Sequence, residues 1–430
     1  GSEEQSKIMQ IDVLNNSKLT KDEKLENMNK VCNKYTLYDI DGDKTTFIGS
    51  TFWRSGEKEQ YLNNCIVLGE SSDIDMPNTE IRCVDTEKKL LLAWRDLIVK
   101  EDPDIIIGYN IFGFDYAFMC DRAKETNCYN DFLKLSRNKD EECEVKDSTL
   151  QIASGSHALK YIDMNGRVSI DLYNYFRREF NLESYKLDFV GGNFIGDKIK
   201  DFVNVGETCK LISKNMSGLH VGNYINFQEI GHSVDYYEDG KKYIVSAIDH
   251  TKNEITINGN LELNKEKIMK WCLAKDDVTP QDIFRLTETG NPDDKAVIAK
   301  YCIQDCNLVH YLINKIDVIT GLVEMANICS VPMSFLVMRG QGIKLYSFLS
   351  KRCREMDVLM PDLDKKRGNE GFEGAVVLPP KCGLYLNEPV AVVDYSSLYP
   401  SSIISENLSH DSKVWTREYD LEGRLKKETG

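Results

Sequence analysis

The chain has 430 residues, of which 41% are hydrophobic, and this length suggests two to four domains. Its formal net charge is −15, so any surface that binds nucleic acid must be a local patch. No apolar run approaches the roughly 20 residues that a membrane span needs, so no membrane partner is expected. The 13 cysteines are scattered without a Cys-x-x-Cys pair. This disfavours zinc and indicates reduced thiols in an intracellular protein.

The first hundred residues predict an α/β arrangement. Residues 3–35 are polar and predict a loop with one helix. Residues 46–57 and 61–69 predict two strands around a turn at Ser55–Glu57. An amphipathic helix follows, capped by Asp85 or Thr86 and ended by Pro103. The apolar run at 105–107 predicts a strand covered on both faces, and a helix followed by such a strand indicates α/β layers.

The middle and end of the chain predict a β-rich insertion between helical segments. Residues 159–174 predict a hairpin that turns at Asn165–Gly166. Residues 203–263 alternate apolar and polar side chains, which predicts antiparallel strands with one wet face and turns at 250–253 and 258–259. Helices are expected at about 293–317 and 340–355, and short strands at 375–380 and 389–393.

Three aspartates stand in apolar surroundings, and the first is Asp115. It follows the strand at 105–108 and opens an apolar helix, which is the strand-to-helix crevice where α/β folds place ligands. An aspartate here could equally be a helix N-cap without chemistry, because Asp is a favoured capping residue.

The second aspartate, Asp305, interrupts a helical stripe. The residues spaced for one face of the helix are Val297, Tyr301, Asp305, Leu308 and Leu312. A carboxylate on such a buried stripe costs stability and therefore suggests a function, and Tyr301 lies one turn back on the same face. The alternative is a buried aspartate that a backbone amide or an arginine satisfies.

The third aspartate, Asp394, ends the apolar run at 391–393, and Pro400 suits the first turn of a following helix. The amides of Ser397, Leu398 and Tyr399 would then point from a helix N-terminus, where phosphate binds well. The alternative is a capped turn on a buried strand. Together, the three aspartates predict hard-cation sites for phosphoryl transfer on a polyanion.

The order of three motifs resembles the family B DNA polymerases, near the eukaryotic delta type and its relatives in large DNA viruses. The motifs are NIFGFD at 110–115, YCIQDC at 301–306 and DYSSLYPS at 394–401. The resemblance implies a ribonuclease H-like 3′–5′ exonuclease domain with a β-rich insertion, then the start of an α+β palm. The implied divisions are 1–202 and 264–320 for the exonuclease, 203–263 for the insertion and 321–430 for the palm.

The resemblance implies a role for each matched residue. Asp115 and Asp305 would hold exonuclease metal and Tyr301 would orient the attacking water. Asp394 would hold polymerase metal, and Tyr399 would exclude a ribose 2′-hydroxyl. The amides of Ser397 and Leu398 would hold the triphosphate. Template contacts are implied for the segment from Phe372 through Gly374 to Ala375, and positive charge near DNA for Arg339, Lys344, Lys351 and Arg352.

The same resemblance implies two Mg²⁺ ions, or Mn²⁺, in each active site. The implied partners are primer–template DNA, deoxynucleoside triphosphates and a sliding clamp, in the nucleus or a viral replication compartment. The family's first exonuclease motif, an Asp-x-Glu, is not found, and Asp39 and Asp41 predict a surface turn instead. The chain is therefore expected to be a fragment with half of each metal site. A stand-alone 3′–5′ exonuclease and a catalytically inactive DNA-binding scaffold are the alternatives.

Overall fold

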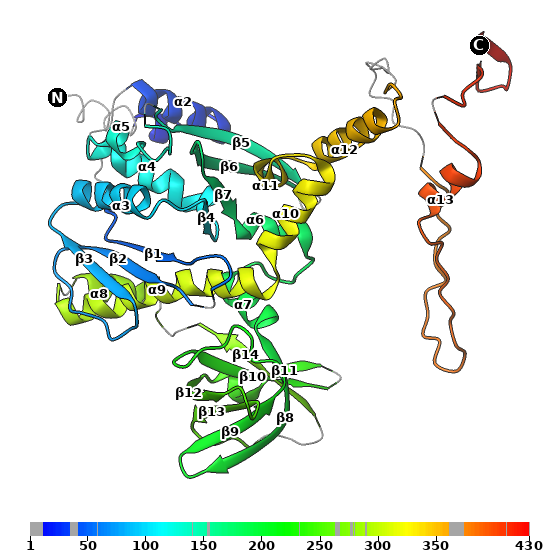
Figure 1. Cartoon of the computed structure of the whole chain (residues 1–430). Coiled ribbons are helices and arrows are strands. Elements are labelled where there is room, and N and C mark those ends of the chain that lie inside the picture. The colour runs from blue at the N-terminus through cyan, green and yellow to red at the C-terminus, as the bar shows by residue number, and fades with distance from the viewer. Residues whose placement is uncertain are drawn as a thin grey trace. The chain divides into compact units, whose positions relative to one another are not determined.

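The computed structural model describes most of the chain as mixed α/β structure. The described residues are 12–34, 42–57, 59–139, 141–152, 155–231, 233–262, 267–275, 278, 280–288, 290–360, 374–409 and 411–429. The chain divides into two compact units, Gly1–Phe348 and Leu349–Gly430, whose helices and strands are labelled in Figure 1. The α/β class predicted from the sequence is confirmed at this level.

The first unit starts with the predicted helix α2 (Lys21–Lys34) and then a three-stranded sheet. Strand β1 (Phe47–Phe52) pairs antiparallel with β2 (Leu62–Leu68), and β2 pairs parallel with β3 (Thr79–Val84). The predicted strand pair at 46–69 is confirmed. Asp39 and Asp41, which predicted a surface turn, lie outside the described residues.

The predicted amphipathic helix is α3 (Glu87–Glu101), and its ends follow the sequence signals. Thr86 caps it by accepting a hydrogen bond from Lys89 N, and Asp102 ends it in a left-handed conformation, just before Pro103. Its apolar stripe is buried at Leu90, Leu91, Trp94, Leu97 and Ile98. Helices α4 (Tyr116–Glu125) and α5 (Tyr129–Phe132) pack with α3 around the same core.

Strand β4 (Ile105–Gly108) pairs parallel with β7 (Val168–Asp171). Ile105 and Ile107 pack on one core cluster, whereas Ile106 packs on another. Both faces of β4 are therefore covered, as predicted, although each of the three isoleucines is only half-buried.

The hairpin predicted at 159–174 is wrong. Strand β6 (Gly155–Asp163) pairs back with β5 (Glu144–Ile152), whereas β7 pairs with β4. The turn at Asn165–Gly166 exists, but it links two sheets. The side chain of Arg137 packs against Gly166, and Arg137 N donates to Asn165 O at 3.0 Å.

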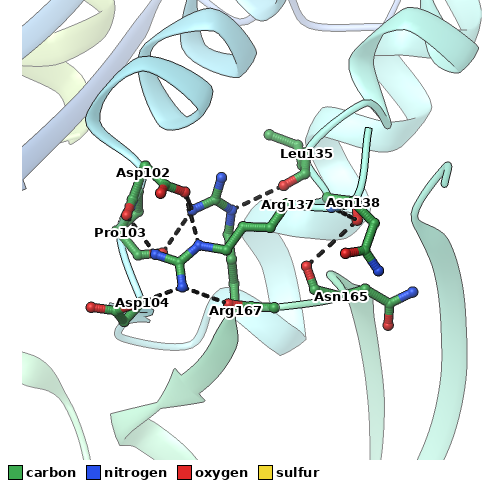
Figure 2. A network of polar contacts seen from close by, with 10 residues as sticks. Asp102, Pro103, Asp104, Leu135, Arg137, Asn138, Asn165 and Arg167 are labelled. Atoms are coloured by element: carbon green, nitrogen blue, oxygen red, sulfur yellow. Dashed lines mark hydrogen bonds and ion pairs between the residues drawn. The ribbon is translucent and has the colours of Figure 1, made fainter. Parts of the chain in front are cut away.

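A network of arginines fixes the starts of β4 and β7, as Figure 2 shows. Arg167 donates to Asp102 Oδ1 and to Pro103 O, both at 2.7 Å, and to Leu135 O at 3.0 Å. Arg137 joins the same aspartate at 2.8 Å. The network holds the two parallel strands in register at one end, so their carboxyl ends come out side by side.

The β-rich insertion is a closed sheet whose strands run from Gly196 to Ala274, beyond the predicted 203–263 at both ends. Pairing follows the order β11-β10-β12-β13-β9-β8-β14, and β14 also pairs with β10. The strands are β8 (Gly196–Val205), β9 (Thr208–Ser213), β10 (Tyr224–Ile230), β11 (Val234–Tyr236), β12 (Tyr243–Asp249), β13 (Glu254–Asn258) and β14 (Ile268–Ala274). Alternating burial along β9 and β13 confirms the predicted wet face.

The remaining described helices of the first unit follow strand β7 in sequence. They are α6 (Leu172–Glu179), α7 (Leu187–Phe194), α8 (Pro280–Glu288), α9 (Pro292–Lys315), α10 (Val318–Cys329), α11 (Met333–Met338) and α12 (Gln341–Glu355), which crosses the unit boundary. The stripe predicted on α9 is only partly right. Leu308 and Leu312 are buried, but Val297 is 48% exposed, whereas Ile298 and Ala299 beside it are buried. The buried face at the start of α9 is therefore not the one that the stripe predicted.

The second unit contains helix α13 (Leu398–Ser405) and a hairpin of β15 (Thr416–Tyr419) and β16 (Leu425–Thr429). The strands predicted at 375–380 and 389–393 are wrong for this structure, in which residues 374–397 form neither helix nor strand. An apolar segment becomes a strand only when another strand pairs with it, and no described strand pairs with these residues. In the described part of the chain, no helix combines the length and apolar character needed to span a membrane.

Candidate active site

The site is built where β4 and β7 end. After Gly108 the backbone turns through Asn110, whose φ is 63°, into a single π-helical turn η1 (Ile111–Asp115). A Cβ on Gly113 would lie 2.3 Å from Asn110 Oδ1, so a larger residue in this turn would displace the Asn110 side chain. Insertions of this π type recur at functional sites, and this one ends on Asp115, where α4 begins.

The side chain of Asp115 is accessible to solvent in the crevice, yet protein surrounds most of it. Desolvation, and to a lesser degree the nearby charge of Asp171, raises the pKa of Asp115 to about 6. The alternative role as a helix cap is not seen, because its side chain makes no capping hydrogen bond to α4. A desolvated carboxylate without a capping role would gain from a nearby cation.

Helix α9 brings a second carboxylate to the crevice. Asp305 lies one turn after Tyr301, and Lys275 Nζ is 2.9 Å from Asp305 Oδ2 and 4.6 Å from the centre of the Tyr301 ring. Burial raises the pKa of Asp305, and the Lys275 ammonium offsets part of that rise. Lys275 is also 4.0 Å from Asp188 Oδ1 on α7. The alternative predicted for Asp305, a buried aspartate paired with an arginine or a backbone amide, is therefore partly confirmed, because a lysine forms the ion pair.

The charges of both carboxylates act on the thiol of Cys306. The charges of Asp305 and Asp115 both raise the pKa of Cys306, in addition to the larger effect of its burial. Asp115 and Asp305 are 190 positions apart in the sequence, so the fold brings these two predicted residues together. No group of three His, Cys, Asp or Glu side chains in the described ranges is arranged to hold a metal ion.

A groove of about 810 Å³ lies between β1 and β4. Residues 50–54 line one side and residues 104–107 the other, with Trp94 and Ile98 of α3 and Ile313 of α9 also in its wall. Among the described strands, β1 pairs only with β2 and β4 only with β7. Each of these strands therefore has one unpaired backbone edge.

The polymerase-like motif lies in the second unit and is open to solvent. Asp394 is exposed and precedes helix α13, which begins at Leu398 as predicted, with Pro400 in its first turn. Ser397 stands before the helix with a φ of 53°, and its side chain makes no capping bond. Tyr399 is 76% exposed. The three predicted amides thus lie at a helix N-terminus, next to Asp394 in sequence.

The remaining predicted DNA contacts lie on exposed or irregular segments. Arg339 stacks over Phe335 at 4.0 Å, and Lys344 is half-buried on α12. Gly374 and Ala375 are exposed without regular structure, and Lys351 and Arg352 are exposed near the end of α12. Phe372 lies outside the described residues.

Sequence reasoning missed two residues of the crevice. Lys275 follows the last strand of the inserted sheet, and no local pattern marks this one lysine among many. Asp171 is 1% exposed and ends β7, as Asp115 follows β4. That parallel position after an apolar run, in the segment RVSID, is a signal that could have found it.

Comparisons with known proteins agree with this arrangement. The model of the exonuclease domain of DNA polymerase family B matches residues 30–190, and the DNA polymerase family B model matches residues 331–429. The DNA polymerase of Phaeocystis pouchetii virus is 44% identical over 98% of this chain and 42% of its own length. That of Pyramimonas orientalis virus is 41% identical, over 89% of the chain and 30% of its own length.

A cellular protein is also similar. The DNA polymerase delta catalytic subunit of Caenorhabditis elegans is 29% identical over 83% of this chain and 26% of its own length. The chain thus spans less than half the length of these relatives. With both family models matched in order, the chain belongs to the family B DNA polymerases.

Proposed function

We propose that the chain provides the 3′–5′ proofreading exonuclease region and the start of the polymerase region of a DNA-templated DNA polymerase. The observation that supports the first activity is that Asp115, which follows β4, and Asp305, on helix α9, both act electrostatically on the thiol of Cys306. The second activity rests on the match over residues 331–429 and on the Asp394-to-Tyr399 motif.

The proposed division keeps the predicted order of domains, with wider bounds for the insertion. A ribonuclease H-like exonuclease is interrupted by the insertion, whose strands run from Gly196 to Ala274 in place of the predicted 203–263, and it resumes up to residue 320. Residues 321–430 begin the palm. The parallel pair β4–β7 beside the β1–β2–β3 sheet supports the ribonuclease H-like arrangement, because one further strand would join the two sheets into one.

That further strand would occupy the groove between β1 and β4. An extended segment there would pair with the unpaired edges of both strands, and each backbone group in it would find a partner. Such a strand, carrying the family's Asp-x-Glu, would add its carboxylates beside Asp115. This accounts for a carboxylate set that is incomplete among the described residues.

Mg²⁺ fits the residues that are present. Asp115 and Asp305 would hold it at the exonuclease site and Asp394 at the polymerase site, because Mg²⁺ prefers carboxylate oxygens. When bound, two such ions activate the attacking oxygen and stabilise the leaving oxygen. The 2.9 Å contact of Lys275 with Asp305 supports the fit, since this crevice already stabilises a positive charge.

The chain's own groups have distinct roles in this proposal. Tyr301 orients the attacking water through its hydroxyl, and Asp305 holds its ligand within one helical turn of that tyrosine. In the second unit, the amides of Ser397 and Leu398 bind the triphosphate of an incoming deoxynucleotide. The ring of Tyr399 fills the space that a 2′-hydroxyl would need. Primer–template DNA and a sliding clamp are the expected partners, in a nuclear or viral replication compartment.

Two reciprocal variants of the full-length protein test the proposal. Asp305→Ala should reduce 3′ digestion of a primer by roughly 1,000-fold or more while primer extension is retained. Asp394→Ala should retain digestion and abolish extension. Asp121→Ala, an exposed acid on α4 that pairs with Lys124, is the control and should change neither rate. Digestion that survives Asp305→Ala, or extension that survives Asp394→Ala, would contradict the proposal.

A further inference from the structure

Asp171, at the end of β7, is an acid of the crevice to which the proposed chemistry gives no role. Its carboxylate accepts four hydrogen bonds from two segments of the chain. Oδ1 accepts from Asn110 N at 2.8 Å and Tyr173 N at 2.9 Å, and Oδ2 accepts from Phe112 N at 3.1 Å and Asn174 Nδ2 at 3.2 Å. A carboxylate has about four acceptor sites, so these four donors use its full capacity.

This saturation separates Asp171 from its neighbour Asp115. A buried charge is tolerated when it is fully hydrogen-bonded, and Asp171 is 1% exposed. It therefore has no oxygen to offer to a cation or a substrate. Asp115, in contrast, is solvent-accessible and makes no capping bond. The two acids at the ends of β4 and β7 thus have different tasks.

The donors of Asp171 show what it holds. Asn110 adopts a left-handed φ of 63°, a conformation that is uncommon for a residue other than glycine and persists when the surroundings enforce it. Phe112 lies in the first part of the π-helical turn η1, and Asp115 is its last residue. One carboxylate therefore caps α6 and also anchors the N-terminal amides of the turn that ends on Asp115.

We propose that Asp171 is a positioning residue for the exonuclease site, which sets the place of the Asp115 carboxylate by fastening residues 110–112 to the end of β7. A second tie between the same strand and helix α4 supports this role. Ser169 Oγ on β7 lies 3.3 Å from Tyr116 OH, directly after Asp115. Strand β7 thus holds the backbone on both sides of Asp115. The inference rests on the proposed exonuclease function.

The test uses Asp171→Asn in the full-length protein. The asparagine side chain has the size of the aspartate side chain, but its NH2 group replaces one of the two accepting oxygens. Two of the four donors that bind Asp171 then have no acceptor. We expect faster amide hydrogen exchange in residues 109–119 and a higher Mg²⁺ concentration for half-maximal 3′ digestion. The digestion rate should fall roughly 100-fold, because small misplacements at a reacting centre have effects of that size. Primer extension should stay within about twofold of wild type.

Asp197→Asn is the matched control. Asp197, on β8 of the inserted sheet, accepts from Asn215 N at 2.8 Å and Ser213 Oγ at 3.0 Å, so it also fastens a turn but lies outside the crevice. It should leave exchange at 109–119 and the Mg²⁺ requirement unchanged.

Two results would overturn the inference. One is unchanged exchange and digestion in Asp171→Asn, and the other is an equal loss of extension and digestion with a lower melting temperature, which would indicate a general structural role. If wild-type protein fails to digest 3′ ends, the proposed function is wrong. The exchange measurement still decides whether Asp171 holds residues 109–119.

Discussion

The two units differ in how their aspartates are surrounded. In the first unit, packed helices and strands desolvate Asp115 and Asp305 and so raise the pKa of both, although solvent still reaches the Asp115 side chain. In the second, Asp394 is exposed, and its neighbours Val392 and Val393 are 91% and 92% exposed. The comparison shows that a motif acquires its electrostatic environment only from the elements that pack around it.

The largest expected effect concerns stability and tests this contrast directly. Phe132 is fully buried and stacks on Trp94 with ring centres 5.8 Å apart. Phe132→Ala should therefore lower the free energy of unfolding by about 3–5 kcal/mol. In the same 430-residue chain, Val392→Ala should change it by about 0.5 kcal/mol or less. Chemical denaturation of both variants measures the difference.

The same valine sharpens the comparison in the full-length protein. If residues 389–393 become a strand of a completed palm, Val392→Ala should there cost about 1–3 kcal/mol. An equally small effect in both proteins would mean that the segment stays exposed, and it would contradict the role of Asp394 at a strand end.

These predictions bear on what sequence patterns can specify. Helix α3 was predicted to within one residue of its N-cap, because capping, periodicity and the proline stop are local signals. The apolar run at 389–393 predicted a strand that the described residues do not form, because a strand depends on a partner that the pattern does not name. The hairpin predicted around Asn165–Gly166 was wrong for the same reason. The turn forms, but the strands on its two sides pair with other strands.

The residues of the candidate site also differ in whether local sequence could predict them. Asp115 could be predicted because it opens an apolar helix after a strand, and Asp305 because it interrupts an apolar helical stripe. Tyr301 was then predicted from its place one turn before Asp305. Lys275 could not, because its contact with Asp305 joins the end of the inserted sheet to a helix. Asp171 could be predicted only in part. The sequence places it at the end of a strand, but it does not show that the four hydrogen-bond donors of its carboxylate come from two separate segments.

A smaller effect is expected for sugar selection at Tyr399. Tyr399→Ala in the full-length protein should raise ribonucleotide incorporation about 10- to 100-fold, since one filled or emptied space of this size changes discrimination by about 1–3 kcal/mol. Primer extension with matched ribo- and deoxynucleoside triphosphates measures it. Tyr395→Ala, in the same exposed segment, is the control. Unchanged sugar selectivity in Tyr399→Ala would contradict the assigned role.

The smallest effect concerns the pH dependence of stability. The pKa of Asp115 in the folded protein is about 6, above its ordinary 3.8, so the metal-free folded state binds a proton more tightly than the unfolded state. Stability is therefore lost as pH rises from about 4 to about 6. Asp115→Asn escapes this loss, so with chelator present it should melt higher than wild type at about pH 8. The difference should shrink towards about pH 5, and a constant difference would contradict the pKa shift.

The central claim is that the embedded aspartates of the crevice bind catalytic cations. The most direct test is a Mn²⁺ titration of the full-length protein without DNA, followed by electron paramagnetic resonance, in wild type, in the double variant Asp115→Asn/Asp305→Asn and in Asp121→Asn. We predict that the double variant loses bound Mn²⁺ at concentrations that load both other proteins. Equal stoichiometry and affinity in all three would contradict the account.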